Sequence, residues 1–346
     1  MTFGVLNHVH TTFTSNIATT VKSPSTRLAK NWKEHHGANN WVGLLNPLDD
    51  TLRSELLRYG KFVQAAYKSF DFDSTSVTYS KSRFPENSLL PLSGYPATGY
   101  QVTRSLHSSS GIKLPWWVVG QQSSSSWIGY VAVCQDEEEI ARLGRRDVVI
   151  SFRGTATCLE WVENFRTKLT RVTKYVAGAD DSGAAAMVES GFWSLYSSVG
   201  FVHRSLQQEL RDEIRRLLDL YENDKSPLSI TFTGHSLGAS LAVLAAYDIS
   251  TTFFQRCSSA HVSVVSFGGP QVGNGRFRRQ VEDLGIKILR IVNTRDIVTK
   301  LPGLGYSDVG EQLNICCSSK NMADCHDLNV YLQLLKQPCT SSNCRF

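Results

Sequence analysis

One serine of this chain stands in a setting that suits nucleophilic catalysis. The sequence places Gly234-His235-Ser236-Leu237-Gly238 between one apolar run and a second apolar run of helical composition. A G-x-S-x-G sequence on a strand-to-helix turn holds the serine hydroxyl clear of the sheet, and the helix N-terminus favours negative charge beside it. The five-residue pattern alone is a weak signal, but the predicted strand before it and the predicted helix after it make it specific. We therefore predict that Ser236 is a nucleophile, in preference to an ordinary serine in a tight turn.

The predicted nucleophile needs a base and an acid. On this kind of turn the partners follow in the order serine, acid, histidine. Only two histidines lie beyond the turn, and His261 introduces a strand before any well-placed acid, so we predict His326 as the base. Asp296 follows an apolar run through a three-residue turn, which puts it at the carboxyl end of a predicted strand. We predict Asp296 as the acid and keep Asp308 as an alternative.

The same chemistry needs two hydrogen-bond donors for the oxyanion of a tetrahedral intermediate. The backbone N–H of Leu237, the residue after the nucleophile, supplies the first. The second is expected from the loop after another core strand, where Arg153-Gly154-Thr155 follows a predicted strand. Thr155 offers both a backbone N–H and a hydroxyl. It could also cap a helix, and one residue can serve both purposes.

A short apolar segment follows the predicted oxyanion loop. Leu159, Val162 and Phe165 recur at helical spacing, with Trp161 beside them. An amphipathic helix at this place suits a lid that covers the site in water and docks on lipid. The alternative is an ordinary surface helix packed on the core.

Composition limits the class of protein. Hydrophobic residues make up 41% of the 346 residues and charged residues 19%, values that exclude disordered, collagen-like and coiled-coil chains. The most apolar run, Leu237 to Tyr247, is shorter than the ~18 residues of a membrane span and is interrupted by Ser240, so no spanning helix is expected.

The positive charge is concentrated in the first residues. The net charge is +5, and the segment 1–33 contributes four basic residues and no acid, which leaves 32 basic and 31 acidic residues in the remainder. The near-neutral remainder gives no reason to expect a nucleic-acid partner. A basic, acid-free segment rich in Ser and Thr is typical of an organellar transit sequence. The alternative is a disordered N-terminal tail.

The cysteines do not form the framework of a small disulfide-rich fold, because the chain is long and holds eight of them. Their spacing matches no zinc template, since paired C-x-x-C elements are missing. We predict no metal and no cofactor, and keep a regulatory disulfide as an alternative. Five cysteines crowd near the C-terminus: Cys316, Cys317, Cys325, Cys339 and Cys344.

Hydrophobic periodicity predicts the elements that position these residues. A helical stripe over 49–66 is followed at 71–126 by serine-, proline- and glycine-rich text that reads as loops. Strands then alternate with helices, which predicts an α/β fold with a mostly parallel central sheet and helices on both faces. The expected strands are 128–133, 147–152, 228–233, 262–267 and 287–293, and the expected helices are 202–222 and 237–249.

Several motifs together resemble the class 3 lipase family. They read FRGT at 152–155, VESGF at 188–192, TFTGHSLGASLA at 231–242, FGGPQVGN at 267–274 and VNTRDIVTKLP at 292–302. The text NWKEHHGANNWVGLLNPLDDTLRSELLRYGKFVQAAYKSFDFD at 31–73, with CHDLNVYL at 325–332, is similar to the plant plastid-type phospholipase A1 branch related to the anther-dehiscence lipase. The cysteine-rich end does not resemble the usual tail of that branch.

The resemblance implies an α/β-hydrolase fold with a short lid helix and a triad of Ser236, Asp296 and His326. It also implies an oxyanion hole at Thr155 and Leu237. We expect a basic leader over 1–33 and a single lipase domain over 34–346. That domain would comprise an N-terminal helix and loop-rich extension (34–126), a catalytic core (127–338) and a cysteine-containing tail (339–346).

The implied activity is hydrolysis of the sn-1 acyl ester of phospholipids or galactolipids at a membrane or lipid-droplet surface, without a cofactor. The released fatty acid could feed jasmonate synthesis, and the expected compartment is the chloroplast, with cytosol or mitochondrion as alternatives. Other activities that fit the same residues are triacylglycerol lipase and soluble esterase. A non-catalytic lipid-binding or signalling protein is the opposing hypothesis, because the hydrolase fold also serves proteins that have lost catalysis.

Overall fold

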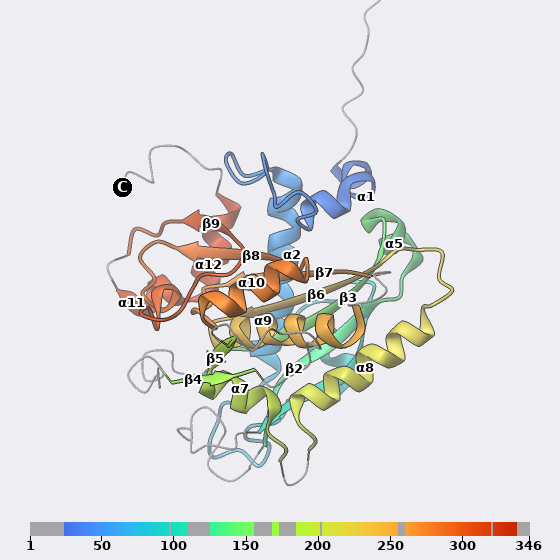
Figure 1. The fold of residues 1–346 in the computed structure, drawn as a ribbon. Coiled ribbons are helices and arrows are strands. Elements are labelled where there is room, and N and C mark those ends of the chain that lie inside the picture. Colours follow the sequence, from blue (N-terminus) through green and yellow to red (C-terminus); the bar gives the residue numbers. More distant parts are fainter. Residues whose placement is uncertain are drawn as a thin grey trace, which may run out of the picture.

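A seven-stranded sheet forms the centre of the molecule (Figure 1). The computed structural model describes residues 24–96, 98–109, 125–155, 168–172, 185–200, 203–254, 260–319 and 321–337. The strands lie in the order β1-β2-β3-β6-β7-β8-β9. Their bounds are β1 Tyr100–Ser109, β2 Ser125–Cys134, β3 Arg146–Phe152, β6 Leu228–His235, β7 Ala260–Phe267, β8 Lys287–Asn293 and β9 Glu311–Ile315. A separate two-stranded sheet pairs β4 (Leu169–Arg171) with β5 (Met187–Glu189).

The strand directions bring the predicted site residues to one edge of the sheet. Strand β2 is antiparallel to both β1 and β3, whereas β3, β6, β7, β8 and β9 are parallel to one another. In this register Phe152 pairs with Gly234, which in turn pairs with Ser266. The loops that carry Thr155, Ser236 and Asp296 therefore all begin at the carboxyl ends of the parallel strands, where active sites are expected in an open parallel sheet. We call this side of the sheet the catalytic edge.

Helices cover both faces of the sheet, as predicted. One face carries α7 (Ser190–Ser197), α8 (Leu206–Leu220), α9 (Leu237–Ile249) and α10 (Gly275–Asp283). Every residue of α9 is buried, and it packs on β3, β6 and β7. The run Leu237–Phe254, which includes a π-helical turn, is long and apolar enough to span a membrane, but 83% of it is buried in the core. Its apolar character is explained by its central position between sheet and outer helices.

The other face carries α2 (Asp50–Ser69) and α12 (Leu328–Lys336), which also pack on each other. The predicted helix over 49–66 is thus confirmed and is three residues longer at its end. Asp49 is its N-cap, because its carboxylate accepts hydrogen bonds from the N–H groups of Thr51 and Leu52. Alternating side chains of each strand point to one face or the other: Val148 and Ile150 pack toward α9, while Val149 packs toward α2.

The chain before α2 packs against the edge of the core. Helix α1 (Pro24–His35) buries Leu28 and Trp32 against α5 (Glu137–Leu143). Residues 24–33 of the segment expected to be a leader therefore lie in a packed helix. The remainder of that segment is outside the described residues, and the role of the leader stays a prediction.

The expectation of loops over 71–126 is wrong for its middle part. Residues 100–109 form β1, and Ser125 and Ser126 begin β2. The serines of β1 misled the prediction because their hydroxyls bind the backbone of neighbouring elements: Ser108 Oγ donates to the carbonyl of Leu195 at 2.7 Å. The structure also contains short helical elements that were not predicted: η1 Glu86–Ser88, α3 Leu89–Leu92, η3 Val298–Lys300 and α11 Met322–His326.

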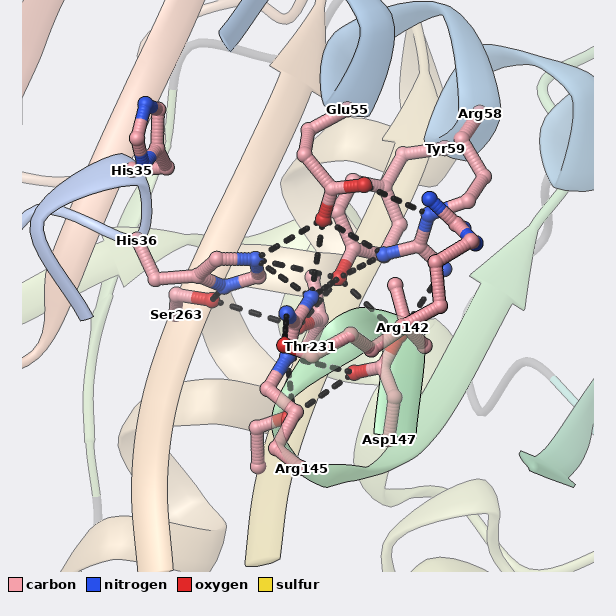
Figure 2. Close-up of polar contacts among 12 residues, drawn as sticks. His35, His36, Glu55, Arg58, Tyr59, Arg142, Arg145, Asp147, Thr231 and Ser263 are labelled. Atoms are coloured by element: carbon pink, nitrogen blue, oxygen red, sulfur yellow. Dashed lines mark hydrogen bonds and ion pairs between the residues drawn. The ribbon is translucent and has the colours of Figure 1, made fainter. Parts of the chain in front are cut away.

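A buried network of charged side chains ties α2 to the amino ends of the strands (Figure 2). Arg145 is fully buried and donates from Nη2 to Glu55 Oε2 at 2.8 Å. Arg58 bridges Glu55 (2.7 Å) and Asp147 (3.0 Å). Burial and the nearby Arg145 lower the pKa of His36 to about 3, so its ring is neutral. The network lies at the edge of the sheet opposite Ser236 and holds the N-terminal helices to the core.

Candidate active site

Ser236 sits on a strained turn between β6 and α9. Its backbone has φ 58° and ψ −125°, a conformation that L-residues rarely adopt. The turn is held because the N–H of Ser236 donates to the carbonyl of Phe267 at 3.0 Å. A Cβ at Gly234 would lie 2.3 Å from the backbone of Gly238, and a Cβ at Gly238 would lie 2.5 Å from the carbonyl oxygen of Arg153. Only glycine fits at either position, as the G-x-S-x-G pattern requires.

Asp296 and His326 form a close pair at the same edge. His326 Nδ1 and Asp296 Oδ2 are 2.5 Å apart, and both side chains are buried. The carboxylate has two further partners: the N–H of Val298 donates to Oδ1 at 2.9 Å, and Tyr331 Oη donates to Oδ2 at 2.6 Å. These bonds fix the orientation of the carboxylate, which in turn fixes the imidazole with Nδ1 toward Asp296 and Nε2 on the opposite side of the ring.

A chain of hydrogen bonds anchors the histidine segment to the serine turn. His235 directly precedes Ser236, and its Nε2–H donates to the carbonyl of His326 at 2.8 Å. Tyr67 Oη on α2 donates to His235 Nδ1, also at 2.8 Å. Burial, with a smaller contribution from His326, holds the pKa of His235 well below its usual range. The ring is therefore neutral, which is the state in which one nitrogen donates and the other accepts.

The loop after β3, which carries the predicted oxyanion donor Thr155, abuts the serine turn. A Cβ at Gly154 would lie 2.8 Å from the carbonyl of His235 and 3.2 Å from Ser236 Cβ. The guanidinium of Arg153 donates from Nη1 to the carbonyl of Gly154 at 2.8 Å. Since the N–H of Thr155 belongs to the same peptide unit and points the opposite way, this bond fixes its direction. Among the described residues, Thr155 Oγ1 is buried with no hydrogen-bond partner.

The alternatives considered for base and acid have other partners. His261 lies in β7, and its Nε2 donates to the carbonyl of His36 at 2.8 Å, at the amino edge of the sheet. Asp308 pairs with Arg290 at 3.0 Å. The predicted lid residues Leu159, Trp161, Val162 and Phe165 lie outside the described residues, as do Cys339 and Cys344.

One cluster has the side chains of a metal site. His107, His203 and Glu209 bring their ligand atoms within 4.8 Å of one another. His107 lies in β1, which β2 and β3 separate from β6 and the Ser236 turn. The two imidazole rings stack at 3.8 Å with an interplanar angle of 5°. Their lone pairs therefore lie in separate parallel planes, and one ring must turn before both could bind one ion. Glu209 already accepts a hydrogen bond from the backbone N–H of His107 at 2.9 Å, and burial and the neighbouring His107 lower the pKa of His203.

Comparison with known proteins identifies the family of this chain. A family model described as Lipase (class 3) matches residues 149–306. A chloroplastic phospholipase A1 of Arabidopsis thaliana is 48% identical, in an alignment that covers 97% of this chain and 83% of the relative. The chain belongs to the class 3 lipase family. A chloroplastic galactolipase of Arabidopsis thaliana is 37% identical, covering 90% of this chain and 70% of that relative.

Solved structures agree on the fold. A nonglycosylated lipase of Yarrowia lipolytica superposes with a TM-score of 0.53 and 18% identity, covering 78% of this chain and 81% of that one. The likeness confirms the predicted α/β-hydrolase fold and, at this identity, supports nothing about substrate.

Several residues that support the site were not predicted from the sequence. His235 on the serine turn donates to the carbonyl of His326, and Tyr331 on α12 donates to Asp296. Tyr67 on α2 donates to His235, and Asn293 at the end of β8 donates to the carbonyl of Cys325, next to His326. His235 is the first of the two variable positions of the G-x-S-x-G pattern, and Tyr331 lies five residues after His326 within the quoted CHDLNVYL motif. The motifs hold these residues, but spacing alone did not assign them a role.

Proposed function

We propose that this class 3 lipase is a serine acyl hydrolase of the phospholipase A1 type, with Ser236 as nucleophile, His326 as base and Asp296 as acid. The observation that carries the proposal is the 2.5 Å contact between His326 and Asp296, on a segment that His235 joins to the strained Ser236 turn. A serine, a histidine and a carboxylate in this order on an α/β-hydrolase fold support acyl transfer.

The steps follow from the proposed roles. His326 takes the proton of Ser236 as the hydroxyl attacks the ester carbonyl, and it then gives that proton to the leaving alcohol. The products of this first half are lysolipid and an acyl-enzyme. Water, deprotonated by His326, attacks the acyl-enzyme and releases the fatty acid. Asp296 holds the imidazole in the required tautomer and stabilises the imidazolium that forms twice in each cycle.

The oxyanion of each tetrahedral intermediate is proposed to bind the N–H groups of Thr155 and Leu237. Leu237 is the first residue of α9, whose N-terminus adds favourable dipolar charge. Arg153 holds the peptide unit that carries the Thr155 N–H. Such preorganised donors typically contribute about 3–4 kcal/mol each to transition-state stabilisation.

The proposed substrate is a phospholipid or galactolipid, cleaved at the sn-1 ester. The support is the name phospholipase A1 of one relative and galactolipase of another. The same relatives are chloroplastic, so we propose a plastid location for this chain, which suits a basic, acid-free first segment.

We also propose that the catalytic edge contacts the lipid surface directly. Leu304 is 100% exposed and Ile297, next to Asp296, is 43% exposed. The turn that holds Leu304 is joined to the segment after β7, because the N–H of Gly303 donates to Gln271 Oε1 at 3.0 Å. Exposed apolar side chains beside a site for lipid favour insertion at the interface. Leu304→Asp should weaken vesicle binding. Val42→Asp should not, because Val42 is exposed at the opposite side of the sheet, two residues after Asn40, which accepts a hydrogen bond from Lys287 at the amino end of β8.

The test uses wild type and Ser236→Ala on mixed vesicles of phosphatidylcholine and monogalactosyldiacylglycerol, each carrying different acyl chains at sn-1 and sn-2. Mass spectrometry identifies the acid released and the lysolipid left. Release of the sn-1 acid that Ser236→Ala abolishes is the expected result. Vesicle binding without release would favour a lipid-binding protein, and activity on dissolved short-chain esters alone would favour an esterase.

A further inference from the structure

Two buried cysteines lie in sulfur contact beside the proposed base. Cys317 follows β9, and Cys325 in α11 directly precedes His326. Their Sγ atoms are 3.0 Å apart, and the residues are only 5% and 2% exposed. Both thiols are free. Since a disulfide bond is about 2.05 Å long, the two sulfurs need to approach by only about 1 Å to become bonded.

The backbones of the two cysteines are already held together by one side chain. The amide oxygen of Asn293 accepts a hydrogen bond from the N–H of Cys317 at 3.3 Å, and its amide nitrogen donates to the carbonyl of Cys325 at 2.7 Å. Asn293 is fully buried at the end of β8. This clamp holds the two cysteine backbones beside each other independently of the sulfurs.

We propose that Cys317 and Cys325 are a reversible disulfide site, oxidised by exchange with a disulfide of the thioredoxin or glutathione class. Only the consequence for catalysis rests on the proposed function: the bond ties β9 covalently to the segment that carries His326, the proposed base. Formation of the bond itself does not depend on the chain being an enzyme.

The exchange proceeds in two balanced steps. Burial and the hydrogen bond that its S–H donates to Cys317 raise the pKa of the Cys325 thiol to about 12, which makes Cys325 a poor attacking group. We therefore assign the first attack to Cys317. Its thiolate breaks the disulfide of the oxidant, forms a mixed disulfide and releases one thiol. Cys325 then loses its proton, attacks the Cys317 sulfur and releases the second thiol. Two protein thiols are oxidised, and the oxidant receives both electrons and leaves as two thiols.

The bond should strengthen the catalytic segment without reshaping it. The Asn293 clamp holds the same contact in the reduced chain, so both forms should turn over lipid at similar rates. Closing a loop between positions 317 and 325 reduces the freedom of the unfolded chain. The oxidised form should therefore have a folding equilibrium constant on the order of 10- to 100-fold larger than the reduced form.

The experiment maps the bond directly. The full chain is equilibrated with oxidised or reduced dithiothreitol, remaining thiols are alkylated, and the protein is digested with trypsin. Cleavage after Lys300, Lys320 and Lys336 separates the two cysteines into peptides 301–320 and 321–336. In the oxidised sample these peptides should be joined and lighter by two hydrogen atoms than their sum, and the urea midpoint of unfolding should be higher.

Variants identify the sulfurs involved. Cys316→Ser should still give the joined peptides, because it leaves the pair intact, whereas Cys317→Ser should give separate alkylated peptides and lose the rise in urea midpoint. Separate peptides in the oxidised wild type, or a link that survives in Cys317→Ser through Cys316, would overturn the proposal. Ser236→Ala should form the same bond although it lacks activity. Failure of the proposed function and failure of the disulfide proposal can therefore be distinguished.

Discussion

Replacing Arg145 by methionine should destabilise the protein severely while sparing the catalytic edge. The guanidinium is fully buried and joins five partners: Glu55 Oε2 (2.8 Å), His36 Nε2 (2.7 Å), Tyr59 Oη (3.1 Å), Ser229 Oγ (3.0 Å) and the carbonyl of Leu143 (3.1 Å). Asp147 Oδ1 is 3.9 Å from its Nε. Without this cation, two buried carboxylates share the single charge of Arg58 (Figure 2).

The expected magnitude follows from removing one partner of a buried ion pair, which costs about 3–5 kcal/mol because the remaining charge stays buried and uncompensated. That is a large part of the ~5–15 kcal/mol that separates most folded domains from their unfolded chains. Unfolding in urea, followed by tryptophan fluorescence, should show a midpoint lower by roughly 1 M or more.

Arg142→Met is the matched control. Arg142 pairs with Glu139 at 2.6 Å within α5, close in sequence to Arg145, and both side chains are half-buried. Because this pair still reaches solvent, breaking it should cost only about 1 kcal/mol. The folded fraction of Arg145→Met should hydrolyse lipid at close to the wild-type rate, since the network lies at the opposite edge from Ser236. A urea midpoint for Arg145→Met equal to that of Arg142→Met would refute the assignment of the network as the tie between α2 and the sheet.

Three further predictions concern the site and its pH dependence. Gly154→Ala should lower kcat roughly 10- to 100-fold in lipid hydrolysis, because its Cβ would lie 2.2 Å from Tyr67 Oη and 3.2 Å from Ser236 Cβ; an unchanged kcat would contradict the close packing of the loop. Tyr331→Phe should lower kcat/KM by about tenfold, since it removes a 2.6 Å donor to the proposed acid; wild-type kinetics would show that this bond is dispensable. The pKa of His36 is about 3 in the folded chain against 6.5 when unfolded. Below pH 6.5 the unfolded chain therefore binds a proton that the folded chain does not, and stability falls by about 1.4 kcal/mol per pH unit down to about pH 3. His36→Gln should lose less urea resistance than wild type between pH 7 and pH 5, and equal losses would contradict the shift.

The core strands and α9 could be predicted because each is a continuous apolar run. The predicted helix over 237–249 and the strand over 287–293 match α9 and β8 residue for residue. Such elements are buried on all sides, so their sequence reports burial directly. The prediction failed for β1, which lies at the sheet edge and mixes exposed and buried side chains, and it did not include β9, whose burial also alternates.

Family and fold were predicted from motifs, and the comparisons confirm both. The contacts that support the site and those of the buried charged network could not be predicted, because they join residues far apart in the chain. Tyr67 and His235 are 168 positions apart, and Arg145 and Glu55 are 90 apart. No periodicity links such pairs, and only the packed fold brings them together. The contact of Cys317 with Cys325 spans eight positions, but it depends on how β9 and α11 meet.

The central claim is that Ser236 is activated by His326 and Asp296, and labelling with a fluorophosphonate tests it most directly. The reagent forms a stable adduct with a serine that a neighbouring base deprotonates. Trypsin should release the adduct on the peptide 226–256, which contains Ser236. The rate of labelling should fall by about a thousandfold in His326→Gln. An adduct on another serine, or equal rates in wild type and His326→Gln, would contradict the account.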